Sequence, residues 1–241
     1  MGKRWVMTYE GAPGACRVTG ARTLEVGQTL EIGREGELAL GVSVPSGAVS
    51  RNAVAITVNQ HGWEVTIGNR NGAVLHPWGQ APELAAPRGT VNWPLVAVRM
   101  LPDSEVSQHW VLIEADDLPV TPAGAVAAAT LTQTDRVEPP GRLPPAERQA
   151  LLTVFGAQLS WPPAHPAEPL LLKQAASREG ISISGMQDRL KSALARAMRL
   201  GQSRVVPLTD PSYLYVLVRA GYLDPPSDFP HRPASVPGEH R

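Results

Sequence analysis

The sequence predicts a multidomain protein in which an all-β sandwich is followed by a small all-α domain. Short runs of alternating apolar and polar residues fill the first part, a Pro-, Ala- and Thr-rich stretch follows, and amphipathic helical periodicity comes after it. The length of 241 residues suits two modules, since single cores commonly stop near ~100–200 residues. The expected boundaries are 1–117 for the sandwich, 118–142 for a linker, 143–224 for the helical domain and 225–241 for a disordered tail.

Strand signals extend from Trp5 to Ile113. The apolar runs are bounded by Gly, Pro and Asn, and no stretch among them shows a helical period with caps. The runs span 22–26, 29–32, 53–58, 63–67, 95–101 and 109–113. Many short strands without a long helix favour two packed sheets, whose loops gather at the two ends of the sandwich.

Charge and cysteine content narrow the class of protein. The formal net charge is zero, but the charges are unevenly distributed. Residues 1–118 carry 9 basic and 12 acidic groups, whereas residues 142–204 carry 9 basic and 4 acidic groups, so the C-terminal part is cationic. The lone Cys16 excludes an intrachain disulfide and a cysteine-based metal site, which suits a reducing cytoplasm. No secretory h-region follows the N-terminus, and no run approaches the ~18 apolar residues of a membrane span. We therefore expect a cytoplasmic protein without a membrane partner.

Helix signals follow the linker. The expected helices span about 144–159, 170–180, 184–201 and 210–221. Gly180 is placed as a C′ glycine, and Asp210 precedes a Pro as an N-cap does. At about 100° per residue, the apolar residues of the third helix share one arc. They are Met186, Leu190, Ala193, Leu194, Ala197 and Met198.

Three loop motifs in the β-domain carry the strongest local signal. They are Gly33-Arg34, Ser50-Arg51 and Asn71-Gly72. Their order, with Trp63-Glu-Val-Thr-Ile between the last two, resembles the forkhead-associated (FHA) family over roughly residues 5–115. The family pattern has a His where this chain has Ala53, a Thr where it has Ala73, and a Ser where it has Asn69.

The resemblance implies a domain that binds phosphothreonine peptides. A phosphothreonine carries about −1.5 to −2 charges and three acceptor oxygens, so its receptor needs a cation and short hydroxyl or amide donors. By the resemblance, Arg34 and Ser50 contact the phosphate, while Arg51 and the backbone near Arg70 line the pocket. Asn71 holds the peptide main chain and Gly72 permits the tight turn. The implied partners are a phosphothreonine-containing protein and the Ser/Thr kinase that modifies it.

Two alternative functions of the β-domain are a scaffold that does not bind phosphate and an enzyme. Because of the three departures, the sandwich could keep the fold without phosphate binding and act as a degenerate scaffold for phospho-independent protein contacts. Catalysis finds little support, since His61, His76 and His109 show no metal-ligand spacing and no Gly-rich loop opens a helix. We expect no enzyme activity, no cofactor and no metal ion.

The segment from Gln174 to Met186 resembles the core of a helix-turn-helix. Ala176 precedes Gly180 by four positions and Met186 follows six later, a spacing that lets two helices pack closely at a turn. Residues 143–224 look like the LuxR-type or winged-helix domains found behind actinobacterial FHA modules, although Arg189 stands where an apolar residue is usual.

The third helix carries the candidate DNA-contacting residues. Arginines on the face opposite the apolar arc suit contacts to duplex DNA, and the alternatives are protein docking or a merely solvated cationic face. The candidates are Gln187, Arg189, Lys191, Ser192, Arg196 and Arg199.

The linker holds two threonines in a polar context, Thr132 and Thr134. We hypothesise that a Ser/Thr kinase modifies one of them and that the chain's own pocket captures it, since a ~25-residue tether spans about 25–30 Å. The alternative is an unmodified spacer.

Overall fold

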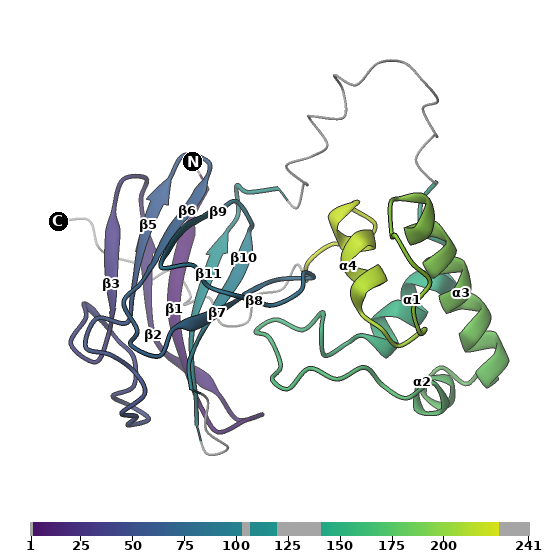
Figure 1. The fold of residues 1–241 in the computed structure, drawn as a ribbon, viewed down its shortest axis with the longest axis horizontal. Helices are drawn as coiled ribbons and strands as arrows, with labels where there is room; N and C mark the ends of the chain where they lie inside the picture. The colour runs from purple at the N-terminus through teal and green to yellow at the C-terminus, as the bar shows by residue number, and fades with distance from the viewer. Residues whose placement is uncertain (1, 103–106, 120–140, 227–241) are drawn as a thin grey trace, which may run out of the picture. The chain divides into compact units, whose positions relative to one another are not determined.

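The computed structural model describes residues 2–102, 107–119 and 141–226, and within them the chain has eleven strands and four helices (Figure 1). The described residues form two compact units. The first contains residues 2–77, 82–102, 107–119 and 226, and the second contains residues 78–81 and 141–225. The proposed phosphorylation sites Thr132 and Thr134 lie outside the described residues.

The first unit is built from two sheets. Within its described residues, one sheet has the strand order β2-β1-β11-β10-β7-β8, and neighbouring strands in it are antiparallel. The strands are β1 (Arg4–Gly11), β2 (Arg17–Leu24), β7 (Ala73–Pro77), β8 (Glu83–Leu84), β10 (Leu95–Met100) and β11 (Gln108–Ala115). The expected runs at 22–26, 95–101 and 109–113 overlap three of these strands.

The second sheet has the order β4-β3-β5-β6-β9 within the described residues, with β3 and β4 parallel. Its strands are β3 (Thr29–Gly33), β4 (Leu38–Ala39), β5 (Val54–Asn59), β6 (Gly62–Ile67) and β9 (Arg88–Val91). Side chains of β5 alternate between buried and partly exposed positions, as a strand with one face on a core requires. The predicted two-sheet β-architecture is confirmed.

A buried arginine ties the two sheets together. Arg4 of β1 is 3% exposed at its side chain, and its Nη1 donates to the carbonyl oxygens of Asn59 (2.9 Å) and Gly62 (2.7 Å), at the turn between β5 and β6. Its Nε and Nη2 donate to the carboxylate of Asp117 at 3.1 and 3.3 Å. The guanidinium also lies over the ring of Trp63. Five contacts thus fix one end of the sandwich.

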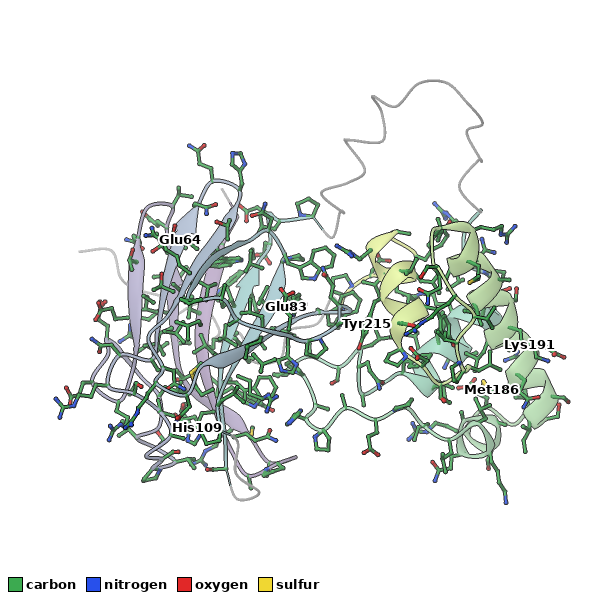
Figure 2. All side chains as sticks on the ribbon, viewed as in Figure 1. Glu64, Glu83, His109, Met186, Lys191 and Tyr215 are labelled. Carbon is green, nitrogen blue, oxygen red and sulfur yellow. The ribbon has the colours of Figure 1, made fainter. Side chains whose placement is uncertain are left out.

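The second unit is helical in its described part. Its helices are α1 (Pro145–Val154), α2 (Leu172–Arg178), α3 (Ile183–Arg199) and α4 (Ser212–Arg219). The apolar arc of α3 is buried from Met186 to Ala197, as predicted, whereas Met198 at its end is partly exposed; Lys191 lies at the surface (Figure 2). The first helix ends at Val154 and not at the expected Leu159, because Gly156 and a Pro-rich stretch follow. None of the helices within the described ranges is both long enough and apolar enough to span a membrane.

The turn between α2 and α3 is held by a carboxylate. Gly180 adopts φ +65°, and the side chain of Ser182 caps α3 by accepting from the N–H of Gly185. Glu179, just before the glycine, accepts from the hydroxyl of Thr153 (2.5 Å) and the amide of Gln149 (3.1 Å) on α1. The turn is therefore fastened to α1 through one side chain.

This contact predicts an acid-sensitive helical unit. The Thr153 hydroxyl, then the Gln149 amide, and more weakly the charges of Arg189 and Arg178 hold the pKa of Glu179 below its usual value. Because the folded pKa lies below the unfolded value of about 4.3, the carboxylate stabilises the unit at neutral pH, and its contribution is lost as the pH falls through the lowered pKa. We expect Glu179→Gln to be less stable than wild type at pH 7 and to lose less stability between pH 6 and pH 3. Thermal unfolding followed by circular dichroism at both pH values measures this; equal pH dependence in the two proteins would contradict it.

Candidate functional site

Register brings the three sequence motifs to one end of the sandwich. Ile32 near the end of β3 pairs with Val54 at the start of β5, and Val54 pairs with Ile67 at the end of β6. The segments that carry Arg34, Ser50 and Asn71 leave from these strand ends. The antiparallel pairing of these strands therefore places the three motifs at the same end of the sandwich.

Arg34 lies directly on the segment that carries Ser50. Its backbone N–H donates to the carbonyl of Ser50 (3.2 Å), and its Nε donates to the carbonyl of Val49 (2.7 Å). The residue is exposed, and apart from the Nε contact its side chain forms no hydrogen bond to the described residues, so the terminal nitrogens keep their donors available. Position 33 requires glycine because the Arg51 backbone packs closely against it: a Cβ there would lie 2.1 Å from the carbonyl oxygen of Arg51.

Ser50 is oriented from two sides. Its Oγ accepts from the backbone N–H of Arg70 (2.9 Å), and its own N–H donates to Oδ1 of Asn69 (3.0 Å). A hydroxyl that accepts one hydrogen bond still has its O–H to donate. Ser50 therefore offers a short donor one residue away from the carbonyl that fixes Arg34.

Asn69 is the residue whose role sequence reasoning missed. It is only 6% exposed, and its Nδ2 donates to the carbonyls of Gly72 (2.9 Å) and Leu101 (3.0 Å), in addition to the bond from Ser50. One amide thus joins the Ser50 segment, the β6–β7 loop and the end of β10. The only signal in the sequence was its departure from the family's Ser, and that departure is here a brace with three hydrogen bonds.

The other two departures lie in the core. Ala53 and Ala73 are both fully buried. Ala53 is held by its backbone, since its N–H donates to Ile32 (2.7 Å) and its carbonyl accepts from Gly68 (2.9 Å). The loop that precedes Ala53 is held by main-chain bonds and by Asn69.

The remaining pocket candidates differ in their surroundings. Arg51 pairs with Glu35 at 3.2 Å, with both side chains well exposed, so much of its charge is already balanced. Arg70 and Asn71 are exposed, and Gly72 adopts φ +81°, which favours glycine. Within the described part of the chain, Arg34 and Arg70 form no ion pair, which leaves two cations beside Ser50.

The six candidates on α3 do not share one open surface. Lys191 and Arg199 are exposed, and Gln187 and Arg189 are partly exposed. Ser192, although exposed, donates to Glu147 of α1 at 2.6 Å. The side chain of Arg196 is only 11% exposed, because it lies 3.9 Å from the carboxylate of Glu147, over the ring of Tyr222, and donates to the carbonyl of Gly141. The expectation of an exposed Arg196 is corrected: α1 and the segment after α4 cover it.

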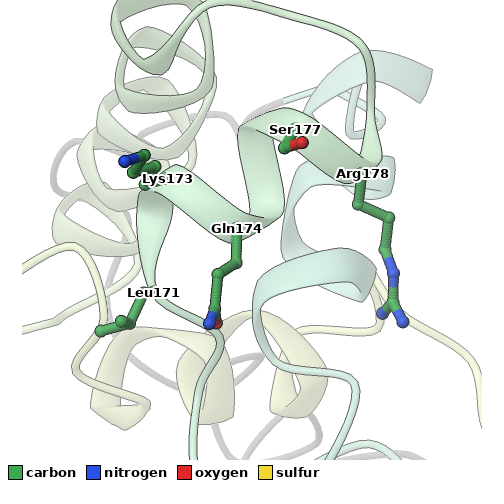
Figure 3. A pocket seen from close by; sticks show the side chains of 5 residues that line it. All are labelled: Leu171, Lys173, Gln174, Ser177 and Arg178. Atoms are coloured by element: carbon green, nitrogen blue, oxygen red, sulfur yellow. The ribbon is translucent and has the colours of Figure 1, made fainter.

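A shallow hollow on the helical unit is lined from α2 and the residue before it. Figure 3 shows Leu171, Gln174 and Arg178 along one side of the helix, and Lys173 with Ser177 along the other. The two cations therefore point in different directions and do not converge on one ligand.

No family model and no curated protein matches this sequence. Among solved structures, the chain is similar to the FHA domain of CT664 protein from Chlamydia trachomatis, with 14% identity over 48% of this chain and 99% of that chain and a TM-score of 0.34. It is also similar to Rv1747 FHA-1 from Mycobacterium tuberculosis (16% identity, 46% and 96% covered, TM-score 0.28). A third similar structure is the FhaA FHA domain complexed with the intracellular domain of Rv3910 (15% identity, 46% and 99% covered, TM-score 0.29).

Proposed function

We propose that the first unit is an FHA-like module that binds phosphothreonine peptides, within an adaptor that couples Ser/Thr kinase signalling to the helical unit. The observation that carries the proposal is the joint placement of Arg34 and Ser50. Nε of Arg34 is fixed to the carbonyl of Val49, and the hydroxyl of the next residue is fixed by Arg70. The guanidinium is therefore anchored on Val49 and the hydroxyl donor belongs to Ser50, so both groups are fixed at neighbouring positions of one loop.

The chemistry of this cluster fits a phosphate monoester. Charge-assisted hydrogen bonds from a guanidinium to phosphate oxygens are among the strongest polar contacts in proteins. Arg34 and Arg70 supply positive charge, and Ser50 supplies a neutral donor. Because backbone hydrogen bonds and Asn69 already order these loops, little ordering entropy opposes binding. The site offers recognition groups on a rigid scaffold, and we propose binding without catalysis.

The experiment compares a phosphothreonine peptide pool with the same pool carrying threonine, by fluorescence anisotropy on the full chain. We expect binding only to the phosphorylated pool, and a loss of about 10- to 100-fold for Arg34→Ala, since a hydrogen bond to a charged group contributes about 1.5–3 kcal/mol. Ser50→Ala should lose less, because its hydroxyl donor is uncharged.

Arg88→Ala is the matched control. Arg88 is also an exposed arginine of the first unit, but it lies on β9 and pairs with Glu64 at 2.7 Å. Its removal should leave affinity unchanged. Binding that ignores phosphorylation, or that survives Arg34→Ala, would favour the alternative of a scaffold with phospho-independent contacts.

For the helical unit we propose docking of an anionic partner, with duplex DNA as the first candidate. The support is the set of cations that remain exposed or partly exposed on α3, namely Arg189, Lys191 and Arg199. Binding to duplex DNA should weaken steeply as salt rises, since each phosphate contact releases counterions. Retention on DNA that is independent of salt, or absent at low salt, would exclude DNA as the partner.

A further inference from the structure

A second polar cluster lies inside the sandwich, apart from the exposed groups of the candidate site. Glu10 of β1 and His109 of β11 are paired across the ladder, and their side chains are 0% and 5% exposed. Figure 2 labels His109 within this unit. Nε2 of His109 lies 3.6 Å from Oε2 of Glu10. A buried carboxylate is costly unless hydrogen bonds satisfy it, so its bonding partners indicate what it holds in place.

Both side chains bond to the same loop. The segment between β4 and β5 begins after Ala39 and carries Ser50. Oε2 of Glu10 accepts from the backbone N–H of Gly41 (2.8 Å), and the Nε2–H of His109 donates to the carbonyl of Val44 (2.8 Å). The other oxygen of Glu10 is satisfied by the hydroxyl of Thr19 at 2.8 Å. Glu10 and His109 therefore hold the first part of the loop by hydrogen bonds from inside the sandwich.

Direct contacts connect Gly41, which Glu10 holds, to the residues of the candidate site. Gly41, at φ +77°, packs so closely on Val49 that a Cβ would lie 2.9 Å from that of the valine. Val49 is fully buried, and its carbonyl accepts from Nε of Arg34. Ser50 is the next residue. The position of the Glu10 carboxylate is thus transmitted through Gly41 and Val49 to both phosphate-binding candidates.

We propose that Glu10 and His109 are positioning residues that hold the Ser50 loop in its binding conformation, an inference that rests on the proposed function of the site. Both side chains are buried, so they act through the loop and not by direct contact with a peptide. Without them the loop samples other conformations, and the apparent affinity falls with the fraction of molecules that are competent to bind.

The test measures anisotropy on the full chain with a degenerate peptide pool that has phosphothreonine at its centre. Glu10→Ala should weaken binding about tenfold, the scale of one buried hydrogen bond left unmade. Glu10→Gln keeps an acceptor for Gly41 and should stay within about threefold of wild type. Arg4→Met is the matched control, because Arg4 is also buried on β1 but contacts the opposite end of the sandwich. It should lower stability and leave the affinity of the folded protein unchanged.

A folded Glu10→Ala protein that binds the phosphothreonine pool as tightly as wild type overturns this inference alone. A wild-type chain that binds no phosphothreonine peptide overturns the proposed function and the positioning role with it. Should Glu10→Ala fail to fold, amide hydrogen exchange of the wild type decides the matter. The Gly41 amide should exchange as slowly as the amides inside β1, and exchange at the rate of an unprotected loop overturns the inference.

Discussion

Replacing Arg4 by Met should destabilise the β-unit by about 3–5 kcal/mol, because two carbonyls lose hydrogen bonds to a charged donor, each worth about 1.5–3 kcal/mol. The methionine fills much of the space of the arginine stem but leaves the carbonyls of Asn59 and Gly62 without their donors. It also abolishes the two bonds to Asp117 and the cation–π contact with Trp63. Chemical unfolding followed by tryptophan fluorescence and circular dichroism measures the change.

Asp117→Asn serves as the graded comparison. The amide keeps an acceptor oxygen toward Arg4, and the side chain at this position is 36% exposed, so water can satisfy what the protein does not. We expect a loss of about 1 kcal/mol, the scale of one weakened hydrogen bond. Equal losses for the two variants, or a loss below about 1 kcal/mol for Arg4→Met, would show that the clamp does not hold the sheets together.

Replacing Asn69 by Ala should affect both stability and binding. Three hydrogen bonds disappear, and the N–H of Ser50 and the carbonyls of Gly72 and Leu101 lose their partner. At about 0.5–1.5 kcal/mol for each bond, the expected destabilisation is about 2–3 kcal/mol. Because the same bonds fix Ser50 and the β6–β7 loop, we also expect the affinity for phosphothreonine peptides to fall by about tenfold or more.

The control is Asn52→Ala in the neighbouring segment. Asn52 is an exposed asparagine, and its substitution should change stability by less than about 0.5 kcal/mol. Unfolding and anisotropy are measured on both variants. If Asn69→Ala behaves like Asn52→Ala, then the backbone bonds alone hold the loops, and Asn69 is not the brace that its geometry indicates.

Local patterns in the sequence were sufficient for the strands that bury one face and for the amphipathic helix α3. The alternation of β5 and the apolar arc from Met186 to Ala197 reflect forces that act within each segment. The expected runs did not include β1, β7 or β9. In β9, Arg-Gly-Thr-Val shows no such alternation and owes its conformation to pairing with β6. The two-residue strands β4 and β8 are likewise products of their neighbours.

In the candidate site too, some features follow from neighbouring residues in the sequence and others depend on residues far away in it. The Gly-Arg and Ser-Arg dipeptides marked two loops that the fold brings together through hydrogen bonds. The role of Asn69 depends on Leu101, 32 positions away, and no local pattern contains that information. Arg196 was placed on an open face for a similar reason, since the helical wheel of α3 does not include the carboxylate of Glu147 on α1. The fold class could thus be predicted from short-range sequence patterns. The hydrogen bonds of Asn69 and the burial of Arg196 could not, because their partners are distant in sequence.

The bonds that shape the candidate site run through main-chain atoms and the buried Asn69, while the side chains of Arg51, Arg70 and Asn71 extend into solvent. Substitutions at positions 51 and 71 should therefore leave the loops folded, and a library at these two positions could be selected for new sequence preferences around a modified threonine. Under the proposed function, architecture and selectivity would be separable in this sandwich, and it would serve as a starting point for engineered reagents that detect chosen phosphorylation events.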